Sequence, residues 1–245
     1  TKLQTFIIFD KIKQDTTQMT TINYLSFAVT PLITIVAILY MKYKFEVKNF
    51  SNIRNAILMG AIGVIILLLA DYFIDLRWDG NYKNMRRMAF FVFVGIALSS
   101  EFAMMLPLRY SLFKLNTFTG PLEGIIYSIF IGLGFSIVAT VLFAFEIIGS
   151  SEQMHNFTLF LYTYPIANLV FSIVLGFFIG MAKLRKNEFI DTLTGLGVAT
   201  FFHGLYYFAF VTSDIRLLIF VALGYVIIAF GLVAKSVSIK MHNQK

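Results

Sequence analysis

The stretch AILMGAIGVIILLLADYFI, residues 56–74, decides the fold class of this chain. It contains one charged side chain, Asp71, and its apolar residues run continuously and do not alternate with polar ones. A helix needs about 20 mostly apolar residues to cross the hydrocarbon core of a membrane. A spanning backbone must also satisfy its own polar groups, which a helix does. Residues 56–74 are therefore predicted to form a transmembrane helix.

Other stretches of comparable apolar character flank it on both sides, and we expect each to cross the membrane as a helix. They are residues 24–41, 88–108, 124–147, 157–182, 193–212 and 215–234. Composition agrees, because 58% of the residues are hydrophobic and 13% are charged, whereas a soluble domain is about half apolar and a quarter charged. The expected fold class is all-α, a polytopic membrane bundle of about seven transmembrane helices.

The chain divides into a transmembrane domain, residues 24–234, and two flanking segments. The N-terminal segment, residues 1–23, is expected to be an interfacial helix or a tail. A cleaved signal peptide is not expected there, because the first apolar run begins late and is followed by Lys42 and Lys44. Residues 235–245 are expected to form a basic C-terminal tail.

Charge indicates an orientation. The net charge is +7, and in a membrane protein Lys and Arg concentrate in loops on the cytoplasmic side. With the N-terminus outside, twelve Lys and Arg residues fall inside and eight fall outside. We therefore predict an outside N-terminus, an inside C-terminus, lipid as a partner and no nucleic acid as a partner. The absence of cysteine excludes disulfides, thiolate metal sites and Cys nucleophiles.

Three polar residues fall at membrane depth, where ionisable groups are costly and often functional. They are Glu101, Asn168 and His203, in three different predicted helices. At 1.5 Å of rise per residue they lie within roughly 6 Å of a common height. Two interpretations remain open. The residues form a functional centre, or they form a hydrogen-bonded clamp between helices without chemistry.

Four motifs resemble those of the PrsW family of intramembrane metalloproteases, which is distantly related to CAAX-protease-like membrane proteins. The stretches PLEGIIY at 121–127 and GLGF at 132–135 are similar to the family's second motif. FHGLYYF at 202–208 is similar to its fourth motif. SEFAM at 100–104 and PIA at 165–167 align with the first and third motifs.

The resemblance covers about residues 90–210, the PrsW-like core, and implies an activity and a location. The family implies a glutamate and two histidines that hold a divalent metal inside a bacterial cytoplasmic membrane. There the metal activates water to cut a peptide bond in or beside a substrate's transmembrane helix. On this resemblance, Glu101 and His203 would be the catalytic residues and metal ligands of an active enzyme.

This sequence departs from the family at most of the positions that carry chemistry. Ser100 replaces the first glutamate, Ala139-Thr140 replaces a Glu-Asn pair, Ala167 replaces the third-motif histidine and Tyr207 replaces an aspartate. A hydrolytic zinc site ordinarily has three protein ligands and an open position for water. Because Glu101 and His203 supply two at most, no metal cofactor is expected, and zinc is expected only if a divergent site is active.

The preferred hypothesis is a catalytically degenerate pseudoprotease that binds a partner's transmembrane helix, a peptide or a lipid in the former active-site cavity. The cavity residues are expected to be Glu123, Thr140, Asn168 and Tyr207. The partner is expected to be another membrane protein or a transmembrane peptide. One alternative is an active metalloprotease with a divergent site. The second is a transporter or channel subunit whose buried acid and imidazole relay protons.

Overall fold

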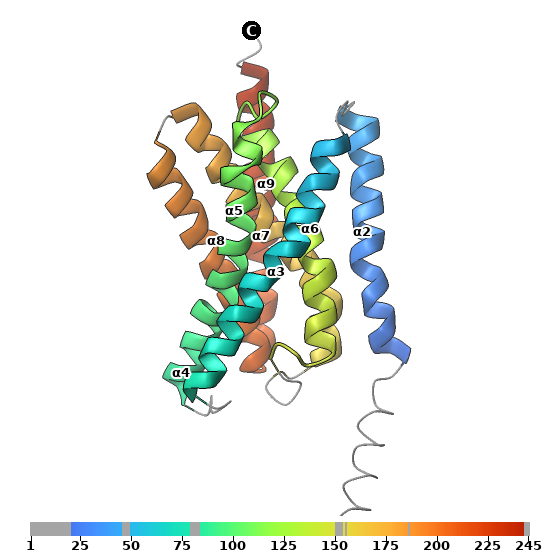
Figure 1. Ribbon diagram of the computed structural model, residues 1–245, viewed down its shortest axis with the longest axis vertical. Helices are drawn as coiled ribbons and strands as arrows, with labels where there is room; N and C mark the ends of the chain where they lie inside the picture. The colour runs from blue at the N-terminus through green and yellow to red at the C-terminus, as the bar shows by residue number, and fades with distance from the viewer. Residues whose placement is uncertain are drawn as a thin grey trace, which may run out of the picture.

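The computed structural model describes residues 21–45, 50–78, 84–149, 154, 156–185 and 187–242. Every regular element within these ranges is a helix, and the long helices run side by side along the longest axis of the molecule (Figure 1). The all-α membrane fold is therefore confirmed. Most of the predicted N-terminal segment, residues 1–20, lies outside the described residues.

Each long helix is unbroken and coincides with one of the predicted apolar runs. They are α2 (Thr21–Phe45), α3 (Phe50–Trp78), α6 (Pro121–Ala144), α7 (Phe157–Arg185), α8 (Glu188–Val211) and α9 (Ile215–His242). The predicted span 88–108 is built from three consecutive pieces, α4 (Met85–Phe90), the π-helix η1 (Phe91–Leu98) and α5 (Ser99–Tyr110). A single 3-10 turn, η2 (Leu112–Lys114), follows.

Six of these helical segments are long and apolar enough to cross a membrane, and they correspond to the second to seventh predicted spans. The first predicted span lies in α2, whose described apolar part, Leu25–Tyr40, is shorter. The predicted helix 124–147 extended too far, because α6 ends at Ala144 and Glu146 adopts a left-handed backbone with φ 54°. Residues 235–242, predicted as tail, continue α9.

Helix α6 lies at the centre of the bundle and touches its neighbours through glycines. A Cβ atom on Gly124 would lie 2.2 Å from the backbone oxygen of Gly176 in α7. On the side facing α3, a Cβ on Gly134 would lie 2.0 Å from the backbone oxygen of Ile57, and one on Gly60 would lie 2.0 Å from that of Ile131. Small residues allow this close backbone contact between membrane helices. These positions therefore require glycine.

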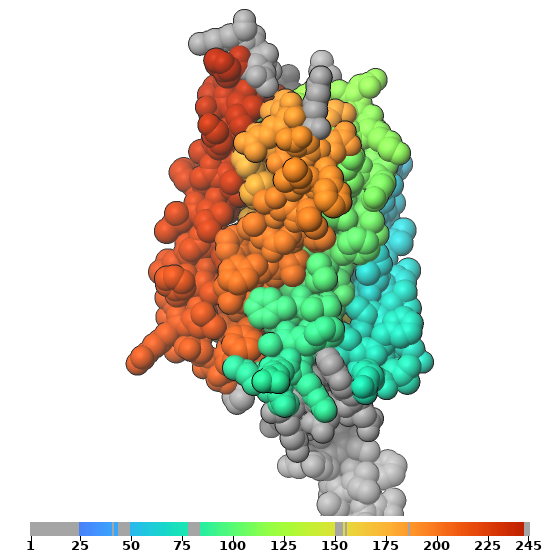
Figure 2. Space-filling view, turned by 90° about the vertical axis from the view of Figure 1, so that its left-hand side faces the viewer, coloured from blue at the N-terminus to red at the C-terminus, as the bar shows by residue number. Residues whose placement is uncertain are grey.

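The outer faces of the bundle are apolar. Large hydrophobic side chains such as Leu39 in α2, Ile62 in α3 and Phe230 in α9 are exposed on the surface of the chain. Figure 2 shows one such face, formed by α8, α9 and the segment from α4 to α5. Because these side chains point away from the core of a membrane-spanning bundle, they contact lipid.

The glycine contacts generate the first prediction. Gly124→Ala is expected to lower the free energy of unfolding by about 1–3 kcal/mol or more, because the added methyl group forces α6 and α7 apart. Thermal unfolding of the purified protein in detergent measures the loss. Gly197→Ala in α8 is the matched control, since a Cβ there meets nothing within 4 Å. Equal stability of the two variants would contradict the close packing of α6 against α7 at Gly124.

Candidate functional site

Among the described residues, a fully buried carboxyl group and a fully buried imidazole form a pair. The imidazole Nδ1 of His203 lies 2.9 Å from Oε1 of Glu101, and both side chains are 0% exposed. Glu101 lies in the first turn of α5 and His203 lies in the second half of α8. The two ionisable residues that the sequence placed at membrane depth are thus in direct contact.

The π-helix η1 sets the direction of Glu101. It ends immediately before α5, and the Ser99 hydroxyl donates to the carbonyl of Val94, five residues earlier, at 3.0 Å. π-Helical turns are rare and are frequent at functional sites, because the wider turn shifts every following side chain around the helix axis. After this shift Glu101 points into the bundle, whereas Phe102 is 40% exposed on its surface.

Aromatic rings hold the imidazole of His203 from the side of α7. The ring of Phe171 stacks on it with 4.7 Å between ring centroids and an interplanar angle of 19°. The ring of Tyr164 lies 6.0 Å away. Gly204 lets α8 approach η1, because a Cβ there would lie 2.3 Å from the ring of Phe93. His203 is therefore fixed between α7 and the helix that carries Glu101.

Asn168 joins the pair to a larger group of buried polar side chains. Its side-chain amide donates to the hydroxyl of Ser136 in α6 at 2.8 Å. Tyr164, one turn earlier in α7, lies with its hydroxyl beside Ser100 and Asn168. We call this group the polar centre; its members are Ser100, Glu101, Ser136, Tyr164, Asn168 and His203. It draws side chains from α5, α6, α7 and α8.

Sequence reasoning did not include Ser136 and Tyr164 in this centre. Tyr164 carried a usable signal, since it lies four residues before Asn168 and therefore on the same helix face. Ser136 carried none, because its contact with Asn168 depends on the register in which α6 and α7 pack.

Thr140 and Tyr207, predicted as cavity residues, each lie one turn beyond the polar centre. Thr140 follows Ser136 on the buried face of α6. Tyr207 is fully buried, and its ring lies 5.5 Å from that of Phe160 and 6.1 Å from that of Phe143. The structure therefore places both residues in the core beside the polar centre.

Glu123 lies elsewhere. It is in the first turn of α6, thirteen residues before Ser136, which corresponds to about 20 Å along the helix. There it forms an ion pair with Lys240 of α9 and accepts a hydrogen bond from Thr119 at 3.0 Å. It lines a separate cavity of about 320 Å³. The structure thus does not bring Glu123 to the other predicted cavity residues.

The donor set of the polar centre does not fit a hydrolytic zinc site. Zinc in proteins is bound by Cys, His, Asp and Glu, and catalytic sites use three such ligands. Within the described ranges no group of three such residues converges, and the centre supplies only Glu101 and His203. One atom of each is already directed at the other. At the third-motif position, Ala167 has no donor atom.

A groove between α5 and α8 opens on the lipid-facing surface. It encloses about 420 Å³ and is lined by Phe102, Met105, Arg109, Tyr110, Glu188, Phe189, Thr192, Leu193 and Leu196. Arg109 and Glu188 form an ion pair across its rim. Figure 2 shows α8 and α5 side by side on this face. No residue of the polar centre lines the groove, and Phe102 directly follows Glu101 in the chain.

Comparison with known proteins agrees with this architecture. The chain is 27% identical to Protease PrsW of Oceanobacillus iheyensis over 189 residues, which cover 76% of this chain and 82% of that protein. It is 24% identical to Protease PrsW of Geobacillus kaustophilus over 187 residues, covering 75% and 78% of the two chains. It is 29% identical to Protease PrsW of Clostridioides difficile over 132 residues, covering 54% of each.

No solved structure matches this chain. The family model described as PrsW family intramembrane metalloprotease matches residues 50–234, which include every helix from α3 to α8 and most of α9. Because that match covers most of the chain and includes the whole polar centre, this protein belongs to the PrsW family of intramembrane metalloproteases.

Proposed function

We propose that this chain is a non-catalytic member of its family that binds the transmembrane helix of a membrane partner. One observation carries the proposal: the polar centre holds one carboxylate and one imidazole, and these two bond to each other. The remaining members are two serines, a tyrosine and an asparagine, which are not among the usual ligands of zinc. A metal-dependent hydrolase would need a further ligand and a free base.

The pair suits a structural role in the absence of a metal. A buried charge without a partner is strongly destabilising, and Nδ1 of His203 and Oε1 of Glu101 partner each other across two helices. The second atoms, Oε2 of Glu101 and Nε2 of His203, make no hydrogen bond to the residues that the structure describes. Full burial of Glu101 and His203 also separates them from solvent and lipid. In this proposal the pair joins α5 to α8 and shapes the groove between them.

The groove between α5 and α8 is the proposed contact site for the partner helix. Its interior is mainly apolar and opens to the surface that faces lipid, which suits the side chains of a transmembrane helix. The charges at its rim, Arg109 and Glu188, neutralise each other. This balance favours an uncharged apolar segment as the occupant over a charged lipid headgroup.

Family membership favours an active intramembrane metalloprotease as the second candidate function. In that case Glu101 would act as base and His203 would hold the metal together with side chains that the family motifs do not include. The relatives are named as proteases, and this activity is the one that the proposal excludes for this chain.

Metal content and cleavage distinguish the two candidates. The purified protein is dialysed against a buffer that contains zinc. We expect it to bind much less than one zinc per chain and to leave transmembrane peptides uncut. Protease PrsW of Oceanobacillus iheyensis is the positive control for cleavage. His203→Leu is expected to leave the zinc content unchanged while costing about 3–5 kcal/mol of stability, because Glu101 loses its buried partner. One zinc per chain, lost together with cleavage in this variant, would refute the proposal.

Photo-crosslinking tests the contact site. A benzophenone amino acid in place of Phe102 or Phe189, both exposed at the groove, is expected to capture the transmembrane helix of one defined membrane protein. The same substitution at Phe220 in α9, which is 76% exposed and does not line the groove, is the control. Equal capture at all three positions, or capture of lipid alone at the groove, would contradict a helix-binding groove.

We also propose that the protein lies in a bacterial cytoplasmic membrane with its N-terminus outside and its C-terminus inside. The excess of Lys and Arg on the proposed inner side supports this orientation, and the similar proteins come from bacteria.

The cysteine-free sequence makes the orientation directly measurable. A membrane-impermeant maleimide is expected to label Thr212→Cys in intact cells, because the α8–α9 turn would face outward. Asn116→Cys, in the exposed loop before α6, is expected to react only after lysis. The reverse pattern of labelling would show that the orientation is inverted.

A further inference from the structure

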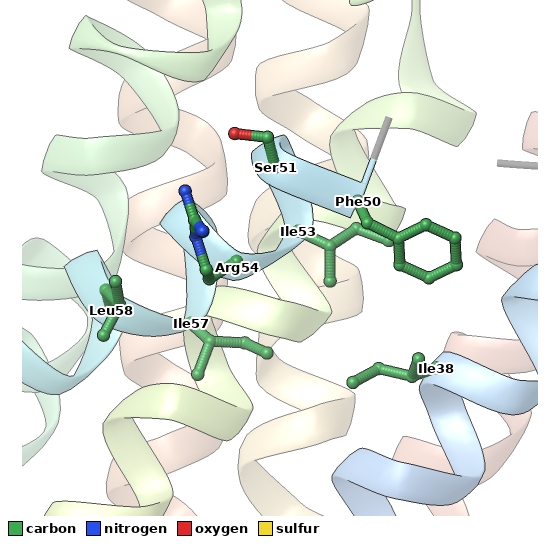
Figure 3. Close-up of a pocket in the computed structure, with 7 residues that line it drawn as sticks. All are labelled: Ile38, Phe50, Ser51, Ile53, Arg54, Ile57 and Leu58. Carbon is green, nitrogen blue, oxygen red and sulfur yellow. The ribbon is translucent and has the colours of Figure 1, made fainter. Parts of the chain in front are cut away.

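An apolar groove between α2 and α3 is the second opening of the bundle toward lipid. It encloses about 420 Å³ and is lined by Ile38 of α2 and by Phe50, Ser51, Ile53, Arg54, Ile57 and Leu58 of α3. In Figure 3, Ile38 faces Ile57 across the groove, while the Ser51 hydroxyl points away from Ile38. The groove itself is thus apolar, and the polar groups of Ser51 and Arg54 lie outside it, near the end formed by the first turns of α3.

The groove is open because α2 packs on other helices. Buried hydroxyl side chains of α2, Ser26, Thr30 and Thr34, mark its inner face, and this helix contacts α6 and α7. Within the described part of the chain α2 hardly touches α3. An acyl chain is a suitable filling for such a gap, since lipid tails are as apolar as the side chains that line it.

The end of the groove near the first turns of α3 has a net positive charge. Arg54 is exposed and forms no ion pair with any residue that the structure describes. Lys42 is exposed near the end of α2. From residue 38 to residue 58 the sequence contains four basic residues, Lys42, Lys44, Lys48 and Arg54, and one acidic residue, Glu46. This end therefore attracts an anion at the level where a phospholipid headgroup lies.

We propose that this groove is a binding site for one anionic phospholipid. An acyl chain lies between Ile38 and Ile57, and the phosphate accepts hydrogen bonds from the Arg54 guanidinium and the Ser51 hydroxyl. Guanidinium groups bind phosphate through charge-assisted hydrogen bonds, which are roughly twice as strong as neutral ones. The position of both residues in the first turns of α3 adds the partial positive charge of the helix N-terminus.

Charge distinguishes this groove from the one between α5 and α8. There the rim cation Arg109 is already paired with Glu188, whereas Arg54 has no such partner among the described residues. A partner's transmembrane helix or a second copy of this chain could fill the apolar part of the groove. An apolar helix carries no anionic group, however, that would pair with Arg54. An anionic phospholipid satisfies both ends of the groove at once.

Native mass spectrometry with defined lipids tests the site. We expect phosphatidylglycerol to bind the purified full chain about five- to tenfold more tightly than phosphatidylcholine, as about 1 kcal/mol per basic residue near a membrane surface implies. Arg54→Gln is expected to abolish this preference, and Arg54→Lys is expected to keep it. Arg77→Gln, at the exposed opposite end of the same helix, is the matched control and is expected to bind as the unmodified protein does.

Two further variants test the acyl-chain part and the competing occupant. Ile57→Trp fills the groove and is expected to weaken binding of both lipids. Leu58→Cys, the single cysteine of its chain, is expected not to form a disulfide between copies in oxidised membranes. Equal binding of the two lipids, unchanged preference in Arg54→Gln, or quantitative disulfide-linked dimers of Leu58→Cys would each overturn the lipid site.

Discussion

The close approach of the α6 backbone to α3 and α7 is the constraint on which the rest of the structure depends. Between helices in lipid there is little hydrophobic driving force, so association relies on close packing and interhelical hydrogen bonds. Gly134 faces Ile57 on one side of α6, and Gly124 faces Gly176 on the other. These contacts fix the antiparallel register of α6 and α7. The hydrogen bond from Asn168 to Ser136 follows from that register.

The Glu101–His203 pair links the two helices that flank the groove between α5 and α8. An ion pair at the rim, between Arg109 and Glu188, joins the same helices near one end. Burying two charges is expensive, and replacing such a pair by apolar residues is often neutral or stabilising. Retention of the pair in this bundle is therefore better explained by the geometry it gives to α5 and α8 than by net stability.

Much of the fold is predictable from sequence because the cost of exposing polar groups to lipid acts locally, on one helix at a time. The same cost singles out Glu101 and His203, together with Asn168, as polar residues at a common membrane depth. The π-helix before Glu101 has no comparable signal, because the stretch Phe91–Leu98 is as apolar as any spanning helix. Glu123 lies apart from the other predicted cavity residues because each residue of a helix adds 1.5 Å along the axis, and thirteen residues separate it from Ser136.

The packing of the interhelical glycines is physically separable from the polar centre. A Cβ added at any of the interhelical glycines would meet backbone or side-chain atoms other than those of Glu101 and His203. The packing that holds α3, α6 and α7 together therefore does not depend on ligand residues at the polar centre. Ala167, where the resemblance to the family leads us to expect a histidine, is an apolar side chain in an apolar core. A change of chemistry at the polar centre would therefore leave the contacts between α3, α6 and α7 in place.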